Sequence, residues 1–213
     1  MTSRFLKCAM GAVLMGALTG CAGLASLTDV ATPVDNYVLT PKSTFASSLP
    51  NLKYQIVVEQ PTATAAVDTD QIAVQPNPLE VQYLPGARWV DRAPLIVQAL
   101  LIESYENSQR VPAVGSSTIG LRADFLIVTD IREFQAIVPP GDSTAPLRVD
   151  VRLNIKIVDA FEDRIIGSRS FEEIVPSTSD APRDVVAAFD EALGDTMRDS
   201  VEWSIREISK YTP

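Results

Sequence analysis

Two cysteines and the absence of histidine limit the chemistry available to this chain of 213 residues. Without histidine it lacks the commonest general base, the Ser-His-Asp arrangement and most transition-metal sites. The sequence contains neither G-x-G-x-x-G nor G-x-x-x-x-G-K-[ST], so it has no recognisable cradle for a dinucleotide or for the phosphates of ATP. It therefore predicts a protein that is not an enzyme and that binds no metal and no cofactor.

Three pairs of acidic residues are the remaining candidates for acid–base chemistry, because two carboxylates can serve as the acid and the base of a glycosidase. These pairs are Asp68/Asp70, Glu162/Asp163 and Glu172/Glu173. All three fall in predicted loops or strand ends, so we interpret them as solvated surface charge. The first pair begins like a calcium-binding loop but lacks the glycine at the sixth position and the terminal glutamate.

Residues 1–20 have the pattern of a secretory signal peptide. Arg4 and Lys7 precede an apolar run over residues 8–18, which is about half of the roughly 20 residues needed to span a membrane. Removal of this leader also removes Cys8 and changes the formal net charge from −9 to −11, because two basic residues leave with it. Such an acidic domain is not expected to bind nucleic acid.

The end of the leader resembles the bacterial lipobox, in which a peptidase cuts before a cysteine that receives lipid. The matching residues are Leu18, Thr19, Gly20 and Cys21. We expect a covalent lipid on Cys21, because several acyl chains anchor a protein durably where a single chain does not. Ala22 in the next position implies the outer membrane, with the protein on its periplasmic side. No thiol then remains for a disulfide, for catalysis or for a metal.

The rest of the chain predicts a tether over residues 21–34 and one domain over residues 35–210. Its strongest strand signal is the alternation of apolar and polar residues from Leu147 to Ile157. Residues 123–137, with a bulge near Arg132, and residues 164–175 complete a predicted antiparallel meander. Shorter strands are expected at residues 36–40, 54–59, 71–75 and 79–83.

Two amphipathic segments, residues 95–105 and 185–208, predict helices, and Pro94 stands where a helix tolerates proline at its start. The predicted fold is therefore α+β. It consists of a single domain with a mixed, mainly antiparallel β-sheet and two main α-helices packed on its apolar face.

The segment from Tyr83 to Arg92 has the composition of a partner interface, because it places Trp89 between Arg88 and Arg92. An alternative interpretation is that Trp89 fills the core at the start of the helix while the stems of the two arginines cover it. The sequence leaves both interpretations open.

Five blocks of sequence closely resemble the ABC-type transport auxiliary lipoproteins, a PqiC-like family. They are YVLTP (37–41), DTDQIAVQPNPLEVQYLPGARWVDRAPLIVQALLIESYENS (68–108), LRADFLIVTDIREFQA (121–136), RSFEEIVP (169–176) and VVAAFDEAL (185–193). The resemblance implies an outer-membrane lipoprotein that works with an MCE-domain protein, an ABC permease and an ATPase to move lipids between membranes. A hexameric MCE partner would suggest a matching ring of copies of this chain, but no residue in the sequence indicates the number of subunits.

Three functions follow as hypotheses. The domain docks the periplasmic end of an MCE assembly, or it carries a phospholipid itself in a gap between the sheet and a helix. The third, an envelope hydrolase, would need two carboxylates that converge in one cleft.

Overall fold

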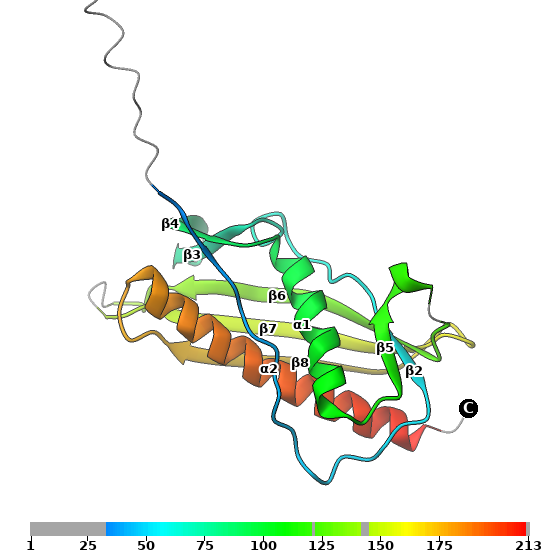
Figure 1. Cartoon of the computed structure of the whole chain (residues 1–213). Coiled ribbons are helices and arrows are strands. Elements are labelled where there is room, and N and C mark those ends of the chain that lie inside the picture. The colour runs from blue at the N-terminus through cyan, green and yellow to red at the C-terminus, as the bar shows by residue number, and fades with distance from the viewer. Residues whose placement is uncertain (1–32, 121, 142–144, 212–213) are drawn as a thin grey trace, which may run out of the picture. The chain divides into compact units, whose positions relative to one another are not determined.

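The computed structural model describes residues 33–120, 122–141 and 145–211, and the folded unit begins at Val34. This unit consists of one eight-stranded sheet with two long helices on one side of it (Figure 1). The expected α+β fold, a single domain with a mixed sheet and two main helices, is confirmed. No helix in the described ranges is long and apolar enough to cross a membrane.

Three long antiparallel strands form the largest part of the sheet, with β8 at its edge. They are β6 (Phe125–Ile137), β7 (Arg148–Asp159) and β8 (Arg164–Pro176), which pair in chain order as the predicted meander. The odd-numbered residues of β7 from Val149 to Ile157 are buried, as the period of two requires. The pairing of β6 with β7 shifts by one residue between Ile131 and Glu133, so the predicted bulge is confirmed.

The other edge of β6 is shared by two groups of shorter strands. The remaining strands are β1 (Asp35–Tyr37), β2 (Gln55–Val58), β3 (Gln71–Asn77), β4 (Glu80–Trp89) and β5 (Ala113–Ser116). Strand β2 pairs in parallel with β5 and with the start of β6. Strand β3 pairs in parallel with the end of β6. Strand β4 is antiparallel to β3, and β1 is parallel to the end of β4. A short 3-10 helix, Ser117–Ile119, follows β5.

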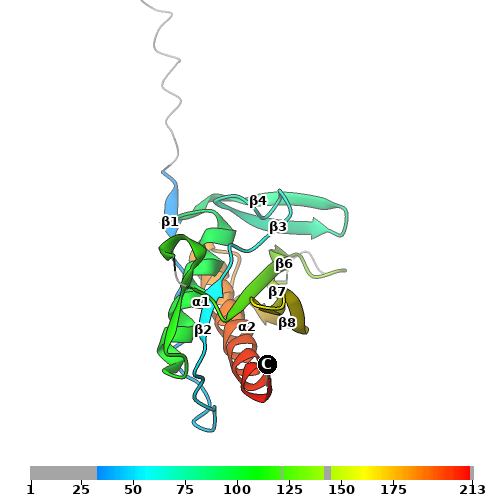
Figure 2. The ribbon, with the colours of Figure 1, turned by 90° about the vertical axis from the view of Figure 1, so that its right-hand side faces the viewer.

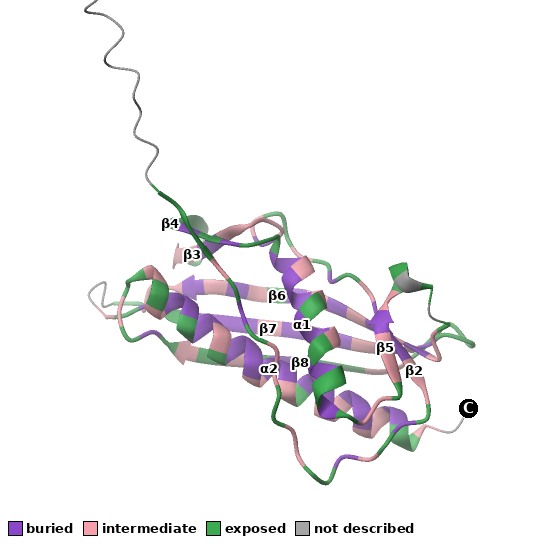
Figure 3. Cartoon of the chain, viewed as in Figure 1, coloured by how far each residue is buried: buried purple, intermediate pink, exposed green. Residues whose placement is uncertain are grey.

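The two helices pack on the apolar side of the sheet, where the buried residues gather (Figure 3; side view in Figure 2). Helix α2 (Pro182–Lys210) starts with proline at its first position, carries Asp184 in its first turn, and contacts β7 and β8. Helix α1 (Ala93–Ser108) lies against β2 and β5, and its C-cap residue, Gln109, has a left-handed conformation. Deep between the helices, the hydroxyls of Tyr105 and Ser204 share a hydrogen bond of 2.6 Å.

The chain between β1 and β2 forms a strap, residues 38–52, that lies against both helices (Figure 1). Carboxylates on successive turns of α2 hold it. Asp190 accepts hydrogen bonds from the backbone N–H of Thr40 at 2.6 Å and from its hydroxyl. Asp195 forms an ion pair of 2.7 Å with Lys42. Acidic residues that the helical pattern places on the polar face of α2 therefore fix a covering segment.

Asp150 on β7 is a buried acidic residue whose protonation affects the stability of the fold. It is only 7% exposed, and its Oδ1 has no hydrogen-bond partner in the described residues. Burial raises the pKa of this carboxyl to about 6, with a further contribution from the charges of Glu172 and Glu133. Because an unfolded aspartate has a pKa near 3.9, the native state binds the proton more tightly, and this stabilisation is lost as the pH rises through about 6.

We therefore expect Asp150→Asn to unfold at higher urea concentration than the wild type at pH 8, with a gain of about 1–3 kcal/mol that shrinks towards zero near pH 4. Urea denaturation at the two pH values measures this difference. Asp163→Asn, in the exposed turn after β7, is the control and should leave the free energy of unfolding unchanged at both pH values. A variant less stable than the wild type at pH 8 would contradict the assigned pKa shift.

Candidate functional site

The hairpin formed by β3 and β4 projects from the sheet on the side opposite the helices (Figure 2). Its tip carries Leu79, which is 98% exposed, followed by Val81 at 45% and Tyr83 at 38%. Because side chains alternate along a strand, Val81 and Tyr83 lie on the same face of β4. We call these three residues the hairpin tip. They form an apolar surface on a protruding element, of the kind found at partner sites.

Trp89 lies at the base of this hairpin and is buried, with an exposure of 2%. Its ring meets Phe189 of α2 edge to face at 5.1 Å and lies tilted against Phe134 of β6 at 5.9 Å. The interpretation of Trp89 as a surface contact is therefore wrong, because the large ring fills the core where β4 ends and α1 begins. The predicted interface retains Tyr83, Arg88 and Arg92, which are exposed.

The two arginines pair with the two aspartates of the first acidic pair. Arg92 Nε donates to Asp68 Oδ1 at 2.9 Å, and Arg88 Nη1 lies 3.4 Å from Asp70 Oδ2. The backbone joins the same segments, since Trp89 N–H donates to the Asp70 carbonyl at 2.7 Å. Asp68 and Asp70 thus neutralise neighbouring arginines and fix the hairpin base, which is a structural role rather than an acid–base one.

The other two acidic pairs lie in different places on the β7–β8 hairpin. Glu172 is 3.8 Å from Arg152 Nε on the face of the sheet opposite the helices, whereas Glu162 and Asp163 are in the exposed turn between β7 and β8. Within the described ranges, no group of three or more acidic or cysteine residues could hold a metal ion. Of these residues, Glu162 lines the pocket described next, together with Asp124 and Asp159 from other segments. The hydrolase hypothesis therefore stays a hypothesis.

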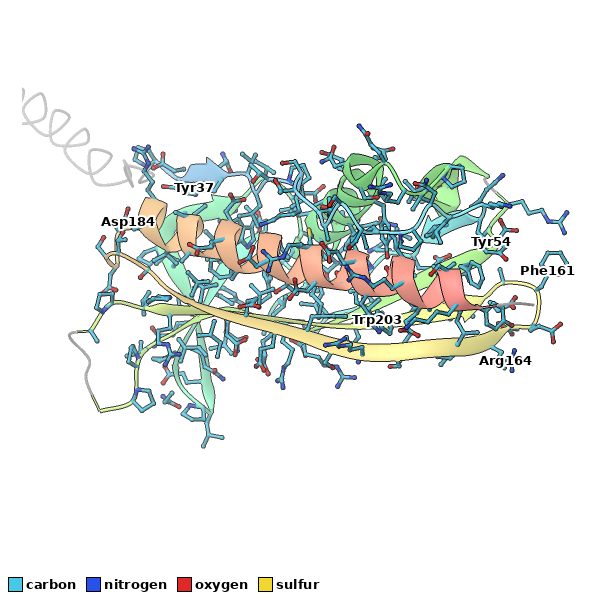
Figure 4. The ribbon with its side chains drawn as sticks, turned by 90° about the horizontal axis from the view of Figure 1, so that it is seen from below. Tyr37, Tyr54, Phe161, Arg164, Asp184 and Trp203 are labelled. Carbon is cyan, nitrogen blue, oxygen red and sulfur yellow. The ribbon has the colours of Figure 1, made fainter. Side chains whose placement is uncertain are left out.

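A pocket of about 420 Å³ opens at the other end of the domain, beside the last turn of α2. Figure 4 shows Tyr54, Phe161 and Arg164 together at this end, while Tyr37 and Asp184 lie at the opposite end of the helix. We call it the aromatic pocket. Its lining residues are Tyr54, Asp124, Phe125, Asp159, Phe161, Glu162, Arg164 and Tyr211.

Contacts among the lining residues hold the inner wall of the aromatic pocket in place. Phe125 packs edge to face with Tyr54 at 5.1 Å and with Tyr211 at 5.7 Å. Asp159 accepts hydrogen bonds from the Tyr211 hydroxyl at 2.7 Å and from the backbone N–H of Phe161 at 2.8 Å. These bonds hold the pKa of Asp159 below its ordinary value, so the floor carries a negative charge.

The sequence did not predict this pocket because its lining residues come from separate segments. They precede β2, begin β6, flank and form the β7–β8 turn, and follow the end of α2. The one indication in the sequence was a phenylalanine in a predicted turn, Phe161, which the structure shows to be 70% exposed. The lipidation prediction at Leu18, Thr19, Gly20 and Cys21 lies outside the described residues, as does the leader. It stays a prediction.

Comparison with known proteins places this fold in a family. The family model for the ABC-type transport auxiliary lipoprotein component matches residues 37–199. An uncharacterized protein of Bradyrhizobium diazoefficiens is 30% identical over 193 residues, which is 88% of this chain and 50% of that protein. The chain thus spans about half the length of the curated relative it matches.

Among the solved structures that resemble this chain, two illustrate the shared fold. The crystal structure of a Xanthomonas campestris protein is 26% identical, with a TM-score of 0.78 over 83% of this chain and 98% of that one. The crystal structure of a second, uncharacterized protein has a TM-score of 0.59 at 14% identity over 83% of this chain and 99% of that one.

Truncation of Trp89 should separate its core role from the surface role of the hairpin tip. We expect Trp89→Ala to lower the free energy of unfolding by about 3–5 kcal/mol, because it empties a site between two phenylalanine rings. Tyr83→Ala, on the exposed part of the same strand, should change it by roughly 0.5 kcal/mol or less. Urea denaturation compares the two variants, and equal losses would argue against the core position of the indole.

Proposed function

Because the chain belongs to the ABC-type transport auxiliary lipoprotein component family, we propose that it is the outer-membrane docking subunit of an ABC transport system that moves lipids. Lipid on Cys21 holds the domain at the periplasmic face of the outer membrane. The domain receives the periplasmic end of an MCE-domain protein, which in turn works with a permease and an ATPase of the inner membrane. Lipids then cross the periplasm within protein rather than through water, where exposed methylenes are costly.

The hairpin tip is the observation that carries this proposal. Leu79, Val81 and Tyr83 expose apolar surface on a projecting ribbon, and isolated exposed apolar side chains are ordinary whereas a cluster of them favours an interface. Docking needs such a ribbon to be held in place. The buried Trp89 and the pairing of Arg88 and Arg92 with two aspartates supply that support at its base.

The edge of β4 offers a second means of contact. Strand β1 pairs with β4 only at Ala87–Trp89. Within the described residues, the outer edge of β4 from Glu80 to Gly86 therefore has no strand beside it. A strand of the partner can add to such an edge through backbone hydrogen bonds, while the hairpin tip supplies side-chain contacts.

The anchor is tested by a crosslinked affinity pull-down from solubilised envelopes, with the wild type compared with Cys21→Ala and the captured proteins identified by mass spectrometry. We expect the wild type to recover an MCE protein and the unanchored variant to recover much less. Good yield of the tagged lipoprotein with no transporter component would contradict the docking role.

The hairpin tip is tested by placing a photo-crosslinking residue at position 79. The expected result is a crosslink to a transporter component in intact cells. Position 103 on the exposed face of α1 is the matched control, because Glu103 is also exposed and lies in a regular element away from the hairpin. Equal crosslinking at both positions would show that the contact does not depend on the hairpin.

A further inference from the structure

The aromatic pocket combines ring faces with acidic side chains. Four of its lining residues are aromatic, namely Tyr54, Phe125, Phe161 and Tyr211, and three are acidic, namely Asp124, Asp159 and Glu162. Arg164 is the one basic residue among its described lining residues, so the lining has an excess of negative charge. A wall of this composition favours a cation with an apolar surface over a neutral or anionic ligand.

The carboxylates at the rim remain available to such a ligand. Asp124 uses Oδ2 to accept a hydrogen bond of 2.7 Å from the backbone N–H of Gln55, which leaves Oδ1 without a protein donor in the described residues. Glu162 makes no side-chain hydrogen bond or ion pair within the described part of the chain, although its backbone N–H donates to Asp159 at 3.1 Å. Both can therefore face a bound positive charge.

The rings at this end already hold cations. The guanidinium carbon of Arg122 lies 5.0 Å from the centre of the Phe161 ring, and that of Arg164 lies 5.9 Å from the centre of the Tyr211 ring. Both distances are within the range of about 6 Å in which the quadrupole of a ring attracts a cation. The protein's own arginines thus already make the cation–ring contacts that we expect of a bound cation.

We propose that the aromatic pocket binds an organic ammonium group, held against the rings of Tyr54 and Phe161 and neutralised by Asp124 and Glu162. Its volume of about 420 Å³ lies at the lower end of the range for small-molecule sites, so it suits a headgroup or a free amine and not a pair of acyl chains. The ammonium comes from the headgroup of an amine-bearing lipid or from a small soluble amine. Only the lipid source rests on the proposed transport function.

Binding is measured by NMR titration of the purified full chain with choline, and separately with ethanolamine. The expected result is saturable binding with shifts centred on Tyr54 and Phe161. The neutral analogue 3,3-dimethylbutanol has the shape of choline without its charge and should bind about tenfold more weakly. Equal affinity for the neutral analogue, or no saturable binding of either amine, overturns the proposal.

Three surface variants test the site without disturbing the core. Phe161→Ala and Glu162→Gln remove an exposed ring and an exposed charge, and each should weaken choline binding about fivefold or more. Arg122→Gln removes the cation that competes for the Phe161 ring, so it should bind choline more tightly than the wild type. Leu79→Ala, at the hairpin tip, is the matched control and should bind choline as the wild type does. Wild-type affinity in both Phe161→Ala and Glu162→Gln overturns the proposal.

The source of the ammonium is distinguished with vesicles and the full-length Cys21→Ala variant, which lacks the predicted anchor. Binding to phosphatidylethanolamine vesicles but not to phosphatidylglycerol vesicles, lost on Phe161→Ala, identifies a lipid headgroup. Binding of the free amines without any vesicle preference identifies a soluble ligand, and it leaves the docking function to be judged by the crosslink at position 79. The two proposals can therefore fail separately.

Discussion

The contact of Trp89 with Phe134 and Phe189 is the interaction on which the rest of the arrangement depends. It joins the end of β4, the middle of the sheet and the first half of α2, three segments separated by long stretches of chain. Each large buried ring of this kind contributes about 3–5 kcal/mol to the free energy of unfolding. The edge-to-face geometry of the rings also restricts how the three segments can pack. The direction of the β3–β4 hairpin and the start of α1 both follow from where this ring is placed.

Electrostatic contacts then fix the covering segments on this core. The chain is acidic overall, yet many of its carboxylates are bound rather than free. Asp190, Asp195 and Glu202 hold the strap, while Asp68 and Asp70 face arginines at the hairpin base. Exposed pairs of this sort add little stability individually. Their effect is positional, because each joins two segments that the hydrophobic core leaves unconnected.

Local patterns in the sequence were enough to predict most of the fold. The alternation from Leu147 to Ile157 and the helical period of residues 185–208 each report directly which side chains are buried, so β7 and α2 were predicted nearly to their ends. Strand β5 was missed because Ala113–Ser116 is short and contains glycine, and it pairs only because β2 lies beside it. Strand β4 is longer than predicted, since it continues through Pro85 and Gly86 to Trp89.

The candidate sites were harder to predict for a physical reason. The composition of the Tyr83–Arg92 segment marked it as important, but it could not decide whether Trp89 faced the core or a partner, because an indole suits both. The aromatic pocket left no motif at all. Its rings and carboxylates are ordinary residues in separate segments, and only the closing of the sheet against the end of α2 gathers them.

The route by which the chain enters the domain has a mechanical consequence. Asp35–Tyr37 run in parallel with the last residues of β4, so their backbone hydrogen bonds lie across the strand direction. A pull on the chain before Val34 would load those bonds together in shear, a geometry in which they must break collectively and not one after another. The strap behind them, held by successive turns of α2, would share the load. Tension on the N-terminal segment is thus carried to the hairpin base and the longest helix at once.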